Sequence, residues 1–161
     1  MNGKTATESE VIMTELVLPQ HTNALGSIFG GVVMSWIDIA AAIAAKRHSG
    51  RTCVTASIDE MHFLRPIKQG DIVNIRARLT AVHRTSCEVH VEVSAENPVL
   101  REKFKTTDAM LSFVAVDSQG RPTEMPPLLA DSAEDKQAQE EARKRKQSRE
   151  NLRQSLIKKT K

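Results

Sequence analysis

The chain has 161 residues, of which 40% are apolar, 3% are aromatic and none is tyrosine. This is the length of one domain, with enough aliphatic side chains for a hydrophobic core. The formal net charge is +3, but residues 131–161 hold ten Lys and Arg against six Asp and Glu, so the rest of the chain is close to neutral. We expect a cytoplasmic protein with no membrane partner, because the sequence has neither a signal-peptide pattern nor an apolar run of about 20 residues.

The first ten residues are polar, and we expect them to be flexible. Residues 11–19, VIMTELVLP, have the β-branched content of a strand that ends at Pro19. From Gly31 to Ala45 the sequence is almost continuously apolar and rich in alanine, and KRHS then leads to Gly50. Basic residues in a last turn and a following glycine are typical of a helix end. We therefore expect a helix of about four turns that is buried nearly all round.

Four later segments predict strands. CEVHVEV alternates strictly between apolar and polar residues, and VNIRARL alternates as well. The connections between the segments are short, whereas parallel pairing would need crossovers of roughly a dozen residues, so we expect antiparallel strands. The segments are residues 52–64, 71–82, 86–96 and 105–117. A helix that is apolar on all sides needs more cover than one such sheet provides, which indicates a dimer.

The charged C-terminal segment is residues 128–161, and after Leu129 it holds almost no large apolar side chains. Acidic residues come early and basic residues late, as a helix dipole favours, but such a helix would bury little. A solvated helix packed only at its edge and a disordered tail are both open. Acidic residues are interspersed on both sides of the basic run RKRK, and bulky apolar residues are scarce, so we expect no nucleic-acid partner. We also expect truncation after Leu129 to leave activity within a few-fold of normal.

Asp38 lies in the middle of the apolar helix, and its neighbours one turn away are Met34, Ser35, Ala41 and Ala42. A carboxylate in such a place must be paired, hydrogen-bonded, neutralised or solvated. No cation of its own helix can pair with it. Asp38 therefore either points into a narrow polar stripe or takes part in chemistry.

Gly30 and Gly31 stand where this helix starts, and free backbone N–H groups and the helix dipole favour negative charge there. A plain tight turn would also explain the pair. Together with Asp38, however, they supply what an acyl-transfer site needs, namely an oxyanion donor and a base or nucleophile. Asn23 could shape its loop or orient a water molecule. The two cysteines, Cys53 and Cys87, are too isolated for a zinc site, and we expect no metal.

The stretch PQHTNALGSIFGGVVMSWIDIAAAIAAKRHSG, followed by CVTASIDEMHFLRPIKQGDIV and DAMLSFVAVDSQGRP, resembles the acyl-coenzyme A (CoA) thioesterases of the hotdog fold, in particular the cytosolic acyl-CoA hydrolase branch. The resemblance covers about residues 10–127. It implies an α+β domain over residues 11–127, in which an antiparallel sheet wraps around one long central helix. It also implies that two protomers pair their sheets edge to edge, with a homodimer as the minimal unit and a trimer of dimers as the assembly.

By this resemblance Asp38 is the catalytic carboxylate, Asn23 the catalytic asparagine, and Gly30 and Gly31 the pair whose N–H groups polarise the thioester carbonyl. The implied reaction is hydrolysis of fatty acyl-CoA to free acid and CoA, with no cofactor beyond the CoA of substrate and product. Basic residues near strand ends suit the phosphates of CoA. These residues are Arg65, Arg84, Arg101, Lys103 and Lys105.

The alternative is a non-catalytic acyl-CoA sensor. Only about ten residues precede the first strand, which is too few for a helix-turn-helix output domain. For the enzyme, Gly31 and Asp38 would lie about 10 Å apart along one helix, which is too far for one reacting centre. We therefore predict two sites per dimer, each with Asn23 and Gly31 from one chain and Asp38 from the other.

Overall fold

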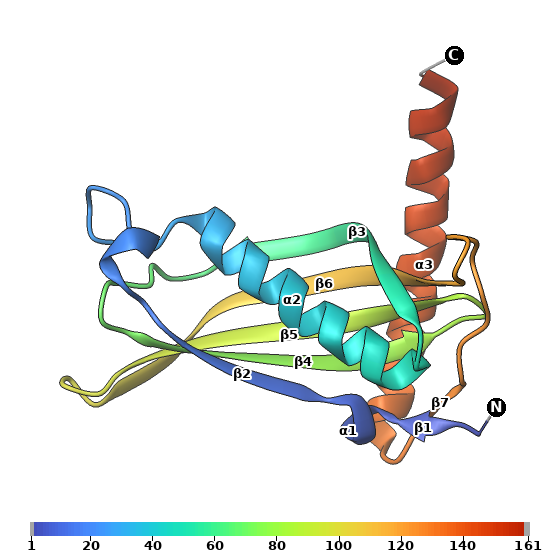
Figure 1. Cartoon of the computed structure of the whole chain (residues 1–161), viewed down its shortest axis with the longest axis horizontal. Helices are drawn as coiled ribbons and strands as arrows, with labels where there is room; N and C mark the ends of the chain where they lie inside the picture. Colours follow the sequence, from blue (N-terminus) through green and yellow to red (C-terminus); the bar gives the residue numbers. More distant parts are fainter. Residues whose placement is uncertain (1, 160–161) are drawn as a thin grey trace.

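The computed structural model describes residues 2–159 of the chain (Figure 1). In chain order its elements are β1 (Lys4–Thr5), α1 (Ala6–Ser9), β2 (Val11–Leu16), the 3-10 helix η1 (Pro19–His21), α2 (Gly30–Ser49), β3 (Thr52–Phe63), β4 (Ile72–Val82), β5 (Ser86–Asn97), β6 (Glu102–Val116), β7 (Leu128–Leu129) and α3 (Ala133–Lys159).

Five long strands form one sheet in the order β2-β4-β5-β6-β3, and every neighbouring pair is antiparallel. The sheet curves around α2 on one face, while α3 crosses the opposite face (Figure 1). The inward positions of β4 and β5 alternate as predicted and are fully buried, among them Ile75, Val89 and Val91. The predicted α+β hotdog fold is confirmed. Two strand limits differ by three residues: β2 ends at Leu16 rather than Pro19, and β6 begins at Glu102 rather than Lys105.

The central helix α2 has 20 residues, about five and a half turns. It ends where predicted, because Gly50 takes the left-handed conformation (φ 64°) that glycine adopts without strain. One side is completely buried against the sheet, but Met34 and Ile39 on the other side are 39% and 49% exposed. The expectation that the helix is buried nearly all round is therefore wrong for a single chain. The reason is geometric, because one sheet can cover only one side of the cylindrical helix.

Strand β3 lies at one edge of the sheet and pairs with β6 alone. Along this edge Val54, Ile58 and Phe63 are 47%, 40% and 52% exposed. A long edge strand with apolar side chains is a ready template for pairing with another strand. The free edge of β3 and the open side of α2 are thus two apolar surfaces that the single chain leaves uncovered.

Residues 2–9 and 133–159 are more ordered than the sequence indicates. We expected residues 1–10 to be flexible, yet β1 pairs with β7, and Ala6 and Ser9 of α1 are buried. The charged C-terminal segment forms α3, which buries Ala142 and the carboxylate of Glu88 completely. The expectation that such a helix would bury little is wrong, because Arg145 and Arg149 of α3 ion-pair with Glu88 on the outer face of the sheet.

Candidate active site

The N-terminus of α2 presents two backbone N–H groups without a partner. Phe29 stands at the N-cap position and gives no side-chain cap. The first helical amide with a partner is that of Val32, which donates to the Phe29 carbonyl at 3.0 Å. Among the described residues, the N–H groups of Gly30 and Gly31 have no hydrogen-bond partner. Such free donors, aligned with the helix dipole, stabilise negative charge on an oxygen placed before them.

Neither glycine is required by the backbone, since both lack the positive φ that favours glycine. A Cβ atom at Gly31 would meet nothing within 4 Å, and one at Gly30 would touch the Phe63 ring at 3.5 Å. The space in front of the Gly31 amide is therefore open to an approaching group.

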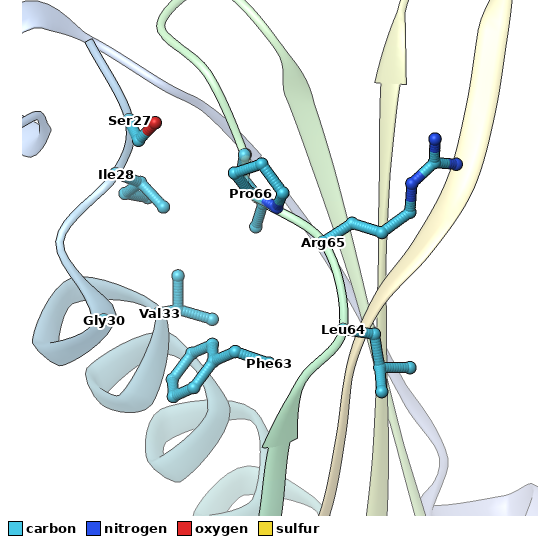
Figure 2. Close-up of a pocket in the computed structure, with 9 residues that line it drawn as sticks. Ser27, Ile28, Gly30, Val33, Phe63, Leu64, Arg65 and Pro66 are labelled. Carbon is cyan, nitrogen blue, oxygen red and sulfur yellow. The ribbon is translucent and has the colours of Figure 1, made fainter. Parts of the chain in front are cut away.

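An apolar pocket of about 260 Å³ adjoins this helix start. It lies between the loop before α2 and the segment after β3, and its lining includes Ile28, Val33 and Phe63. Figure 2 shows Phe63 lying toward Gly30 and Val33, whereas the Arg65 side chain extends away from them. The Arg65 guanidinium stacks over the Phe104 ring, with its Cζ 4.6 Å from the ring centroid. The pocket thus joins the free amides to an apolar space with a cation at its rim.

Asn23 shapes the loop that leads into α2. Its side-chain Oδ1 accepts hydrogen bonds from the backbone N–H groups of Leu25 (2.9 Å) and Ser27 (3.3 Å). Because both partners are donors, the oxygen must face them, and the Nδ2 group points elsewhere. No hydrogen bond within residues 2–159 uses that NH₂ group. Loop shaping is therefore compatible with a second role in which Nδ2 donates to a water molecule or a substrate oxygen.

Asp38 is half-buried and is held by a threonine of the neighbouring strand. The Thr55 hydroxyl donates to Asp38 Oδ1 at 2.8 Å. No Lys or Arg of the described part of the chain forms a salt bridge with this carboxylate. Thr55 was not among the predicted site residues. The sequence carries no signal for it, because its inward position on β3 follows from pairing with the fully buried Phe113 of β6.

The predicted phosphate-binding residues do not gather at one place in a single chain. Arg65 lies at the pocket rim, and Arg101 and Lys103 lie on the β5–β6 hairpin at the same end of the molecule (Figure 1). Lys105 pairs with Glu92 and Asp108, and these ion pairs raise its pKa. Arg84 lies in the β4–β5 turn at the opposite end, where its carbonyl accepts the Met125 N–H. Arg65 thus lines the same pocket as Gly30 with its guanidinium directed away (Figure 2), and Arg84 lies far from both (Figure 1).

The remaining reactive side chains have structural surroundings. His48 is fully buried, its Nε2 donates to the Pro126 carbonyl at 2.9 Å, and burial lowers its pKa. Burial raises the pKa of both Cys53 and Cys87. Within residues 2–159, no three His, Cys, Asp or Glu side chains gather as a metal site would require. The described helices also include none with the length and apolarity needed to cross a membrane.

Known proteins are similar to this chain in sequence and in fold. Residues 25–102 match the model of the thioesterase superfamily. The acyl-CoA thioester hydrolase YciA of Escherichia coli is 37% identical over 123 residues, which cover 74% of this chain and 92% of YciA. A hexameric acyl-CoA thioesterase of known structure is 38% identical with a TM-score of 0.90, over 94% of this chain and 97% of that one.

A third relative is the acyl-CoA hydrolase of Staphylococcus aureus, whose structure was solved with butyryl-CoA and CoA. It is 33% identical with a TM-score of 0.89, over 97% of this chain and 95% of that chain. Structures also exist of its single alanine variants at an aspartate, an asparagine and a threonine. The fold, the site and these likenesses together show that the chain belongs to the thioesterase superfamily, in the family of hotdog-fold acyl-CoA thioesterases.

Proposed function

We propose that this protein hydrolyses the thioester bond of fatty acyl-CoA to a free fatty acid and CoA. The observation that carries this proposal is the pairing of two features on α2. Free, sterically open N–H groups lie at its start, and a threonine-held carboxylate, Asp38, lies near its middle. An apolar pocket beside the free amides suits an acyl chain or the apolar part of the CoA arm.

The relatives support the same assignment. In the S. aureus hydrolase, the substituted asparagine and aspartate are 15 residues apart, and the aspartate and threonine are 17 residues apart. Asn23, Asp38 and Thr55 have the same two spacings in this chain. Three polar residues chosen for substitution in a relative that binds butyryl-CoA thus match the three that the structure places at α2 and its neighbours.

Each residue then has a chemical role. The oxygen of a water molecule adds to the thioester carbonyl carbon, the carbon–sulfur bond breaks, and the thiol of CoA takes up a proton. Asp38 either removes the proton of the water or attacks the carbonyl itself to form an anhydride that water then opens. The Gly31 N–H stabilises the oxyanion, and Asn23 Nδ2 donates to the water or the carbonyl oxygen. Gly30 and the basic residues near the pocket, Arg65 foremost, bind CoA.

The site is complete only in a dimer. Gly31 and Asp38 belong to the same helix, seven residues and so about 10 Å apart along its axis. Two antiparallel copies of α2, packed through their open sides, would bring the start of each helix to the middle of the other. The exposed edge of β3 would at the same time find a partner strand. The hexameric relative supports a trimer of such dimers, and a cytoplasmic location stays a prediction.

Substitution of Asp38 tests this function. Asp38→Asn keeps an acceptor for the Thr55 hydroxyl, so the fold should persist, while kcat for acyl-CoA falls by about 100-fold or more. Release of free CoA from acyl-CoA substrates of graded chain length measures both the loss and the substrate preference. Asp131→Asn, at an exposed aspartate just before α3, is the control and should keep full activity. Unchanged turnover in Asp38→Asn would refute the assignment.

A further inference from the structure

Strand β3 departs twice from regular pairing with β6. The register skips one residue between Thr55 and Ser57 and another between Ile58 and Glu60, so Ala56 and Asp59 have no partner in the ladder. Each such bulge shifts the alternation of side chains between the two faces of a sheet. Thr55 can therefore face α2 on the inner side, while Asp59 faces α3 on the outer side.

Side-chain hydrogen bonds hold the bulged segment at the point where its backbone pairing with β6 is interrupted. Asp59 Oδ1 accepts a hydrogen bond from Ser57 Oγ at 2.7 Å, and Asp59 Oδ2 accepts a longer one from Ser112 Oγ at 3.4 Å. Arg149 of α3 adds the shortest contact, with its Nη1 donating to Asp59 Oδ2 at 2.6 Å. Within the single chain β3 pairs with β6 alone. Ala56 and Asp59 have no partner in that ladder, so the contact from α3 on the outer face helps to fix where the segment lies.

Arg149 is itself fixed from the middle of the sheet. Its Nη1 also donates to Glu88 Oε2 at 2.7 Å, and Glu88 belongs to the central strand β5. Glu88 is fully buried and accepts further hydrogen bonds from Arg145 (2.8 Å) and Thr80 (2.7 Å). One guanidinium thus connects a rigid central strand to the irregular edge strand.

Resting on the proposed hydrolase function, we propose that Arg149 is a positioning residue for Asp38. Through Asp59 it holds the bulged segment of β3, and this segment places the Thr55 hydroxyl at hydrogen-bond distance from the Asp38 carboxylate. Helix α3 then contributes to turnover without touching the reacting atoms. A misplacement of about 1 Å can cost roughly 100-fold in rate, and a loosened segment should cost less, on the order of tenfold.

The test compares four variants with the wild-type protein. Arg149→Gln should lower kcat about tenfold and leave KM nearly unchanged, because no contact to acyl-CoA is removed. Arg149→Lys should recover most of the loss, since one ammonium can donate to both Asp59 and Glu88. Arg143→Gln, at a 72% exposed side chain that pairs only with Glu140 among the described residues, should match the wild type. Arg145→Gln removes hydrogen bonds to Glu88 but none to Asp59. It should lower the melting temperature and leave kcat nearly unchanged.

A double-mutant cycle decides whether Arg149 acts through Thr55. If it does, Arg149→Gln in a Thr55→Ala background should change kcat by less than about twofold, because the two changes damage one interaction. If the reduction in kcat of the double variant equals the product of the reductions in the two single variants, the inference is overturned. So would a rise in KM with unchanged kcat in Arg149→Gln.

Amide hydrogen exchange gives a measurement that does not depend on turnover. Arg149→Gln should accelerate exchange in peptides covering residues 54–61, and Arg143→Gln should not. Equal exchange in both variants would overturn the inference even if turnover fell. An inactive wild-type protein would instead refute the proposed hydrolase function, and the exchange data would still decide whether Arg149 holds β3.

Discussion

At Gly31 neither the backbone nor the packing of the chain explains the glycine. Its φ is not positive, and a Cβ atom there would meet nothing within 4 Å. In a helix, glycine is about 1 kcal/mol less favourable than alanine. The chain accepts this cost at a position whose N–H has no partner among the described residues. We therefore propose that the missing side chain lets a group from outside the chain approach the amide closely.

Replacing Gly31 by alanine separates a structural role of the glycine from a role in catalysis. Gly31→Ala should keep the fold or stabilise it by up to about 1 kcal/mol, because the conformation is ordinary and the space is open. It should lower kcat/KM by about 100-fold, since the new methyl group stands where the thioester oxygen must approach its donor. Thermal unfolding and steady-state kinetics on the same preparation measure the two effects. A large loss of stability would show that the glycine is structural.

The sequence predicts some site residues better than others for a physical reason. Asp38 stands out because a carboxylate within an apolar run is costly unless something uses it. Asn23 allows two roles, and the structure shows that its Oδ1 shapes the loop while its Nδ2 stays free among the described residues. Thr55 could not be assigned, because its contact with Asp38 depends on how a bulged strand lies against a helix 17 residues earlier. Local patterns do not contain that register.

At the scale of elements, the contact between α3 and the sheet depends on one buried carboxylate. Burial raises the pKa of Glu88, but hydrogen bonds from Arg145, Arg149 and Thr80 outweigh it and hold the pKa below its usual range. Glu88 therefore stays ionised and needs its cations. The alternation of CEVHVEV correctly predicts that Glu88 faces outward, but it does not predict that α3 covers this side chain. The partners lie in a segment whose composition predicts only a solvated helix or a disordered tail.

Removing one cation should destabilise the protein more than an ordinary surface change does. Breaking a buried ion pair costs about 3–5 kcal/mol, and Arg145→Gln should cost slightly less, about 2–3 kcal/mol, because Arg149 still contacts Glu88. The double variant Glu88→Gln/Arg145→Gln should recover most of this loss, because a neutral amide needs no cation. Urea unfolding of the two variants and of Arg143→Gln measures the difference. Equal stabilities of Arg145→Gln and Arg143→Gln would show that the ion pair is dispensable.

These contacts also change what we expect of truncation. The sequence indicates that removal of residues after Leu129 leaves activity within a few-fold of normal. In the structure, the same truncation removes Arg149 and with it the contact that holds Asp59 of β3. Loss of α3 should therefore reduce kcat to the same extent as Arg149→Gln. Glu88 would become solvated rather than stranded, so the fold itself should survive.

At the scale of the whole molecule, the uncovered surfaces of the single chain imply how the site is completed. Met34 and Ile39 on the open side of α2 are exposed, and so is Val54 on the edge strand β3. Since Asp38 also lies on α2, a second copy packed here would cover the apolar residues and would bring its own helix start to Asp38, as we propose. If the site is shared in this way, the isolated chain should be inactive and each dimer should hold two equivalent shared sites.

Subunit complementation tests this arrangement. Inactive Asn23→Ala and Asp38→Ala proteins are mixed, and their subunits are exchanged by mild denaturation and refolding. In a mixed dimer one site carries both substitutions, and the other takes Asn23 and Gly31 from one chain and Asp38 from the other, all intact. Random pairing makes about half of the dimers mixed, each with one working site of two, so about a quarter of normal activity should return. If mass spectrometry confirms exchange while activity stays at the level of the parents, each chain must carry a complete site of its own.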